Sequence, residues 1–187
     1  VDGQAKPVMS TPRPGVIKVD AATGFAHAAI DLGFDSLIPL AREQGIAALA
    51  IDNSYNCGVL GCHTYRLAQA GLLGIGFTNA PASIAPSGGS KPVVGTNPFS
   101  ISAPDEDGNA ALLIDQSAST IAKSEVMKHA REGKEVPLGW VLDADGAPTT
   151  DPEAGLKGSM VPSGDYKGVG IALTVELMAA AMTGATL

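Results

Sequence analysis

The sequence contains very little cysteine, and this shortage excludes two kinds of protein. Its 187 residues include two cysteines, Cys57 and Cys62. One possible pair cannot form the disulfide framework of a small secreted domain. His63 follows Cys62 directly, but no second Cys/His cluster is present in the sequence to complete a metal site. We therefore predict neither a disulfide scaffold nor a bound metal.

The sequence also lacks an excess of positive charge and a long apolar run. It carries 12 Lys and Arg against 19 Asp and Glu, a formal net charge of −7. Because phosphate binding needs a basic face, we predict no nucleic-acid partner. No run approaches the roughly 18 apolar residues of a membrane helix, so we predict no membrane association. The first residues show no charged segment followed by an apolar core, so we expect a cytoplasmic protein.

Apolar residues and glycine are abundant instead. Hydrophobic residues make up 45% of the sequence, whereas aromatic residues make up only 4%, and there are 23 glycines. This composition indicates a well-buried domain, or part of one, in which backbones pack closely and large side chains contribute little.

Apolar periodicity predicts alternating helices and strands. Apolar residues recur at helical spacing over 21–44, and Pro39 predicts two helical pieces or one kinked helix. The continuous apolar run 46–51 is typical of a strand buried on both faces. Residues 134–164 are rich in Pro, Gly and Asp, and this composition predicts a long irregular segment that covers other parts of the chain. The remaining predicted elements are helices over 58–70, 117–133 and 168 to the end, strands over 72–78, 92–104 and 110–114, and a turn over 105–109.

Short polar or Gly/Pro-containing turns follow several of the apolar runs, as in loops that carry chemistry on an α/β scaffold. No G-x-G-x-x-G pattern lies between a strand and a helix, and no Walker-type loop is present. The standard sequence motifs for nucleotide binding are therefore absent. The turns occupy residues 79–86, 95–99, 114–119 and 165–168.

In this order, and with Thr78 and Gly88-Gly89, these turns resemble those of the malate/L-lactate dehydrogenase-like family, which includes Δ1-piperideine-2-carboxylate reductases. The resemblance implies an α/β protein with a non-Rossmann NAD(P)-binding fold, a mixed sheet flanked by helices. It also implies an extended segment over 1–20 and a central cofactor- and substrate-binding region over 21–187. Family members are homodimers, so self-association is expected.

The resemblance also implies site residues. Asp115 is expected beside the substrate carbon that receives hydride, and its segment is expected to contact the dinucleotide. The implied cofactor-binding residues are Ala80, Asp115, Gln116, Ser117 and Lys167, and the implied substrate-binding residues are Thr96, Phe77 and Asn56. Read without the family, Asp115 could cap a helix that follows it, Lys167 could be a solvated surface lysine, and Thr96 could belong to a simple turn.

Asn56 departs from the family pattern, which has a histidine at this position. An asparagine can hydrogen bond but cannot transfer a proton near neutral pH. His63, two helical turns further on, could face the same cleft or could be a helix-surface or partner-contacting residue. The sequence leaves this choice open. Asn56 and its neighbours Tyr55 and Cys57 lie where substrate choice would be made.

The implied activity is hydride transfer between NAD or NADP and a small 2-oxo or 2-hydroxy acid, or a cyclic imine carboxylate. Both substrates receive hydride at a carbon that bears a carboxylate. Family members begin with a Ser-His-Gly-like motif, whose histidine donates a proton, and end with a segment that closes over the cofactor. Neither motif is found in this sequence. We therefore expect a central fragment that is inactive alone, and the rival hypothesis is a catalytically silent, self-associating domain.

Overall fold

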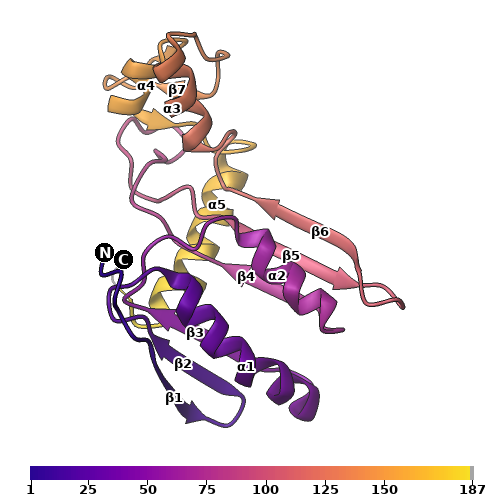
Figure 1. Cartoon of the computed structure of the whole chain (residues 1–187). Helices are drawn as coiled ribbons and strands as arrows, with labels where there is room; N and C mark the ends of the chain where they lie inside the picture. Colours follow the sequence, from indigo (N-terminus) through magenta and orange to yellow (C-terminus); the bar gives the residue numbers. More distant parts are fainter. Residues whose placement is uncertain (186–187) are drawn as a thin grey trace. The chain divides into compact units, whose positions relative to one another are not determined.

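The computed structural model describes residues 1–185, and the chain divides into two compact units (Figure 1). Unit 1 contains Val1–Gly76, Ser100–Asp115 and the C-terminal segment from Ala179. Unit 2 contains Phe77–Phe99 and Gln116–Met178. Each unit has its own buried apolar cluster, so each is described by itself.

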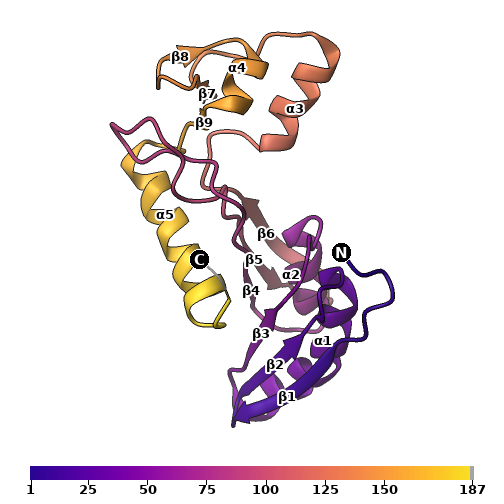
Figure 2. The ribbon, with the colours of Figure 1, turned by 90° about the vertical axis from the view of Figure 1, so that its left-hand side faces the viewer.

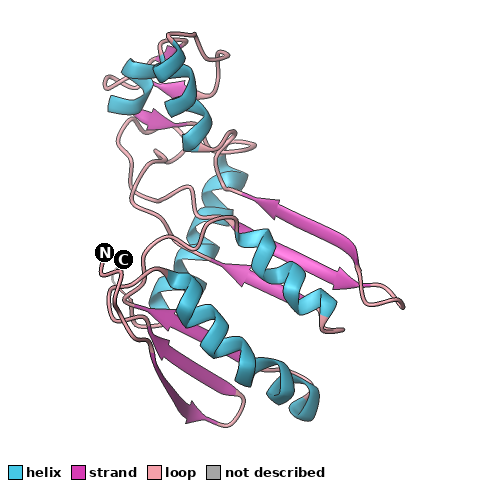
Figure 3. Ribbon diagram, viewed as in Figure 1, coloured by secondary structure: helices cyan, strands magenta, loops and turns pink. Residues whose placement is uncertain are grey.

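The first sheet of unit 1 has the strand order β1-β2-β3 (Figure 3). β1 (Val8–Arg13) pairs antiparallel with β2 (Val16–Asp20), and β2 pairs parallel with β3 (Ala48–Asp52). Helix α1 (Ala26–Gln44) connects the two parallel strands and runs without interruption through Pro39. The predicted segment 1–20 thus contains the first two strands.

Helix α1 packs its apolar face on this sheet. Gly33 allows the close approach, because a Cβ atom there would collide with the side chain of Leu49. Gly45 ends the helix in the left-handed conformation, with φ 84°. The prediction that 46–51 is buried on both faces was wrong, since β3 residues are half-buried or exposed and Ile46 is 82% exposed. α1 covers one face of the strand. The core here contains Ile17, Val19, Ala29, Ile30, Phe34 and Leu37.

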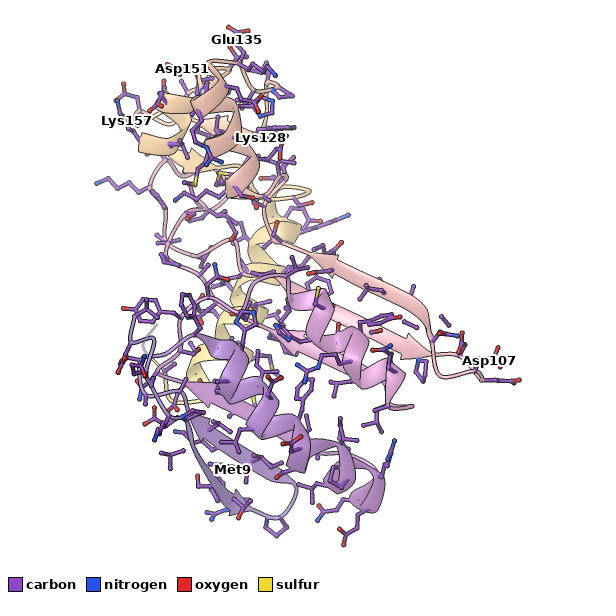
Figure 4. The ribbon with its side chains drawn as sticks, viewed as in Figure 1. Met9, Asp107, Lys128, Glu135, Asp151 and Lys157 are labelled. Atoms are coloured by element: carbon purple, nitrogen blue, oxygen red, sulfur yellow. The ribbon has the colours of Figure 1, made fainter. Side chains whose placement is uncertain are left out.

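The second sheet of unit 1 has the order β4-β5-β6, from β4 (Gly74–Phe77), β5 (Phe99–Pro104) and β6 (Ala110–Gln116). Asp107 lies in the turn that joins β5 to β6 (Figure 4). Helix α2 (Leu60–Gln69) packs on this sheet, and Thr64 of the helix hydrogen bonds to Ser100 of β5 at 2.6 Å. The strand predicted over 92–104 begins only at Phe99. Before it, Val94 pairs with Ile84 in an isolated antiparallel bridge, and Asn97 has a φ of 36°, which is outside the strand region.

Unit 2 contains a small sheet and three helices (Figure 2). The sheet has the order β8-β7-β9, with both pairs antiparallel. The core of this unit includes Ile84, Val126, Val141, Met160 and Ala172. Its elements are α3 (Lys123–Glu132), β7 (Val141–Leu142), β8 (Pro148–Thr149), α4 (Pro152–Lys157), β9 (Ser159–Met160) and α5 (Tyr166–Glu176).

Three predictions for unit 2 need correction. The segment 134–164 is not irregular throughout, since it contains three short strands and α4. The helix predicted over 117–133 begins at Lys123, because the hydroxyls of Ser119 and Thr120 donate instead to the backbone carbonyl oxygens of Ile121 and Pro162 in an irregular segment. The last predicted helix comprises α5 and a π-helical turn, Leu177–Ala181. The final part of that prediction, 186–187, lies outside the described residues.

Candidate functional site

Two of the predicted site residues, Ala80 and Thr96, lie on turns that hydrogen bond to each other within unit 2. The Ala80 N–H donates to Asn97 Oδ1 at 3.0 Å. A Cβ atom at Gly95 would collide with the Ala80 carbonyl oxygen, so only glycine permits this approach. The GTNP run is therefore a tight backbone junction, and it holds the Thr96 residue next to the turn that carries Ala80.

The segment that contains Ser117 joins this junction. The N–H of Ala118, the next residue, donates to the Thr96 carbonyl oxygen at 2.8 Å. The Ser117 hydroxyl lies 3.0 Å from that of Ser119, which donates in turn to the Ile121 carbonyl oxygen. The serine-rich turn is thus fixed by its own hydroxyls as well as by its main chain.

Lys167 lies in the first turn of α5, beside the same serine-rich turn. Gly168, its neighbour, packs so tightly that a Cβ atom would lie 2.6 Å from the Ser163 carbonyl oxygen and 2.7 Å from that of Ala118. The Ser163 N–H also donates to the Ala118 carbonyl oxygen at 2.8 Å. Unit 2 therefore brings together segments that are far apart in the sequence, namely those that carry Ala80, Thr96, Ser117 and Lys167.

Asp115 lies at the end of β6, in unit 1. Its Oδ2 accepts a hydrogen bond from the Gly61 N–H at 2.7 Å, in the first turn of α2. The residue that precedes α2, Val59, provides no side-chain cap, so the Asp115 carboxylate satisfies a free amide of that helix. It does not cap the helix that follows it, because α3 begins later with Ala122 at its N-cap.

Asn56 lies in the loop between β3 and α2, also in unit 1. Its Oδ1 accepts from the Gly58 N–H at 2.6 Å, and the side chain is exposed. His63 Nε2 lies 2.7 Å from the Cys57 carbonyl oxygen in the same loop. A carbonyl can only accept, so Nε2 carries the hydrogen.

His63 is buried rather than on the helix surface, with 9% of its area exposed. Its ring packs edge to face on that of His27, with the centroids 5.6 Å apart. Its Nδ1 atom has no hydrogen-bond partner within the described part of the chain. The hydrogen bond from His63 to Cys57 stabilises the loop that carries Asn56.

The remaining predicted residues, Phe77 and Gln116, are the terminal residues of β4 and β6. Phe77 is half-buried and Gln116 is exposed. Phe77 and Gln116 belong to unit 2, as do Ala80, Thr96, Ser117 and Lys167. Asn56 and Asp115 belong to unit 1.

Sequence reasoning missed one residue of unit 2. Glu176, in the last turn of α5, accepts hydrogen bonds from the side chains of Asn79 and Asn97, at 3.4 and 2.6 Å. One acidic residue within the otherwise uncharged run 169–181 was a signal that could have identified it. Among residues 1–185, no group of three His, Cys, Asp or Glu side chains could hold a metal ion. Over the same residues, we find no helix with the length and apolar character to cross a membrane.

Comparison with known proteins agrees with the resemblance found in the sequence. A family model described as malate/L-lactate dehydrogenase matches residues 1–187. The chain is 48% identical over 169 residues to a (2R)-3-sulfolactate dehydrogenase (NADP(+)) from Chromohalobacter salexigens, covering 90% of this chain and 50% of that protein. It is 40% identical over 184 residues to a Delta(1)-pyrroline-2-carboxylate/Delta(1)-piperideine-2-carboxylate reductase from Pseudomonas aeruginosa, covering 98% and 55%.

Among solved structures, the chain matches a Δ1-piperideine-2-carboxylate reductase from Pseudomonas syringae with a TM-score of 0.94 and 37% identity. The match covers 100% of this chain and 56% of that structure. The chain thus spans about half the length of the curated relatives it matches.

Proposed function

This chain belongs to the malate/L-lactate dehydrogenase family and has its non-Rossmann α/β fold, and we propose that its protein transfers hydride between NADP(H) and 3-sulfolactate or a similar small 2-hydroxy acid. The observation that carries this proposal is the 48% identity to a (2R)-3-sulfolactate dehydrogenase (NADP(+)) over 90% of the chain. In the proposal, residues 21–187 form the cofactor- and substrate-binding region.

In this proposal unit 2 binds the cofactor, and the support is that its backbone junction brings together the segments that carry Ala80, Ser117 and Lys167. Lys167 is exposed in the first turn of α5, where its charge and the helix N-terminus both favour a phosphate group. Ala80, Gln116 and Ser117 would form the surrounding wall. NADPH, when bound, supplies the hydride. We assign NADP rather than NAD because the sulfolactate dehydrogenase relative is named for NADP(+).

At the substrate end, the proposed contacts are hydrogen bonds to anionic oxygen atoms. The Thr96 hydroxyl and the Asn56 side-chain amide can each donate to a carboxylate or a sulfonate, and Phe77 would line the pocket. Asp115, held by the Gly61 amide, would lie beside the carbon that receives hydride. Asn56 cannot supply the proton that the new hydroxyl oxygen needs near neutral pH. In this proposal the proton donor is therefore a residue other than Asn56.

A second candidate is reduction of a cyclic imine carboxylate. The Pseudomonas aeruginosa reductase, 40% identical over 98% of the chain, and the matching Pseudomonas syringae structure favour it. A protonated imine carries positive charge, and the carboxylate of Asp115 would attract it.

The test is NADPH oxidation by the full-length protein with 3-sulfopyruvate, pyruvate and Δ1-pyrroline-2-carboxylate, each repeated with NADH. We expect the highest kcat/KM with 3-sulfopyruvate and NADPH. A higher kcat/KM with the cyclic imine would establish the second candidate instead. No turnover with any pair would favour the silent domain and reject both.

A further inference from the structure

Asn97 joins the turn that carries Ala80 to helix α5. Its side chain is fully buried, with 0% of its area exposed. Nδ2 donates to the Ala172 carbonyl oxygen at 2.9 Å and to Glu176 Oε2 at 2.6 Å, while Oδ1 accepts from the Ala80 N–H at 3.0 Å. The Asn97 side-chain amide thus uses both of its hydrogens and its oxygen, and it connects the turn that carries Ala80 with the last two turns of α5.

The backbone partners fix the orientation of the Asn97 amide. The Ala80 N–H can only donate, and the Ala172 carbonyl oxygen can only accept, so Oδ1 and Nδ2 cannot be exchanged. The second Nδ2 hydrogen therefore points to Glu176, whose Oε2 must accept it. Hydrogen bonds to a carboxylate are stronger than neutral ones, so Glu176 is the strongest acceptor of this set.

The turn that contains Asn97 has a conformation that needs such support. Asn97 has a φ of 36°, in the left-handed region that asparagine tolerates better than most residues. Gly95, two residues earlier, makes the close approach to the Ala80 carbonyl described above. Backbone held in sparsely populated conformations persists only when surrounding contacts fix it. Loss of the Glu176 bond would leave a buried amide hydrogen without a partner.

We propose that Asn97 and Glu176 are positioning residues, which hold the Ala80 and Thr96 turns in a fixed place along α5. The first turn of this helix carries Lys167, and its last turn carries Glu176. The helix would therefore set the spacing between the lysine and the wall on the other side of the cofactor. This inference rests on the proposed function, because it assigns Ala80 and Lys167 to one ligand.

The test compares Glu176→Ala with Glu176→Gln in the full-length protein. Glu176→Ala should raise the KM for NADPH roughly tenfold, the scale of one hydrogen bond to a charged group, with a smaller change in kcat. Glu176→Gln keeps an oxygen that can accept from Asn97, so its KM should stay within about threefold of wild type. The matched control is Glu135→Ala, at an exposed glutamate of the same unit (Figure 4), which should leave KM unchanged.

A purely structural role would lower Tm in Glu176→Ala but leave the KM of the folded enzyme at the wild-type value, and this result would overturn the proposal. If wild type itself shows no turnover, the proposed function fails, and amide hydrogen exchange at Ala80 decides the positioning claim. Faster exchange in Glu176→Ala than in Glu135→Ala supports a turn held by Glu176. Equal exchange rejects it.

Discussion

At the scale of single residues, Asp115 combines an observed contact with a proposed one. Its carboxylate accepts from the Gly61 N–H and so satisfies an amide at the start of α2. A Cβ atom at Gly61 would lie 2.8 Å from Asp115 Oδ2, so a larger residue there would force the helix and the carboxylate to move apart. Removing the side chain would affect helix stability as well as any role in hydride transfer, and the two effects must be separated.

We predict that Asp115→Asn and Asp115→Ala separate them. The asparagine keeps an oxygen for the Gly61 amide but loses the charge, so it should fold with near-wild-type Tm and lose turnover. The alanine loses both and should also cost about 1 kcal/mol in the free energy of unfolding, as for other lost caps. Thermal unfolding and kcat of the full-length variants are the measurements. Wild-type kcat in Asp115→Asn would refute the assigned role.

At the scale of elements, a side-chain contact joins the loops that follow the parallel strands β2 and β3. Asp20 Oδ1 accepts from the Ala22 N–H at 2.7 Å and from Asn53 Nδ2 at 3.1 Å. These bonds favour the charged carboxylate, so the pKa of Asp20 lies below its ordinary value, chiefly through the Ala22 amide and then through Asn53. Ala22, Thr23 and Asn53 all have positive φ, so both loops depend on such local support.

This contact predicts a pH-dependent contribution to stability. Because the folded pKa is lowered, the contribution is complete above the ordinary aspartate pKa and is lost as pH falls through the lowered value. Asp20→Asn should therefore have a lower Tm than wild type at about pH 7, and the difference should shrink towards about pH 3. Asp35→Asn, at an exposed aspartate of α1, is the control. A Tm difference independent of pH would contradict the prediction.

At the scale of the whole molecule, apolar side chains remain exposed on the β4-β5-β6 sheet of unit 1. Ile75, Leu112 and Ile114 are 51%, 48% and 38% exposed. Gly74, Gly76 and Asp115, which alternate with them, contact α2. Exposed apolar surfaces of this kind often mark a site of protein–protein interaction.

We predict a homodimer for the full-length protein, as the family resemblance implies. Light scattering coupled to size-exclusion chromatography should give twice the mass of one chain, and the mass should persist on dilution to assay concentrations. The intact mass of the polypeptide, compared with its coding sequence, is the necessary control. A monomer mass at all concentrations would contradict the prediction.

The sequence by itself determined the family, the α/β class and most element positions. Long periodic segments such as 21–44 and local signals such as Gly45 act within one helix or strand, so sequence alone shows them. The short strands within 134–164 were missed because their pairing partners lie in separate parts of that segment. The assigned roles of the site residues stay predictions.

Only the tertiary structure decided which residues meet. Asp115 caps α2 rather than a helix that follows it, and His63 is buried against the loop of Asn56. Glu176 reaches Asn97 across a long stretch of sequence. These contacts depend on long-range backbone placement and on glycines that permit close approach, and no local pattern of residues encodes such distances.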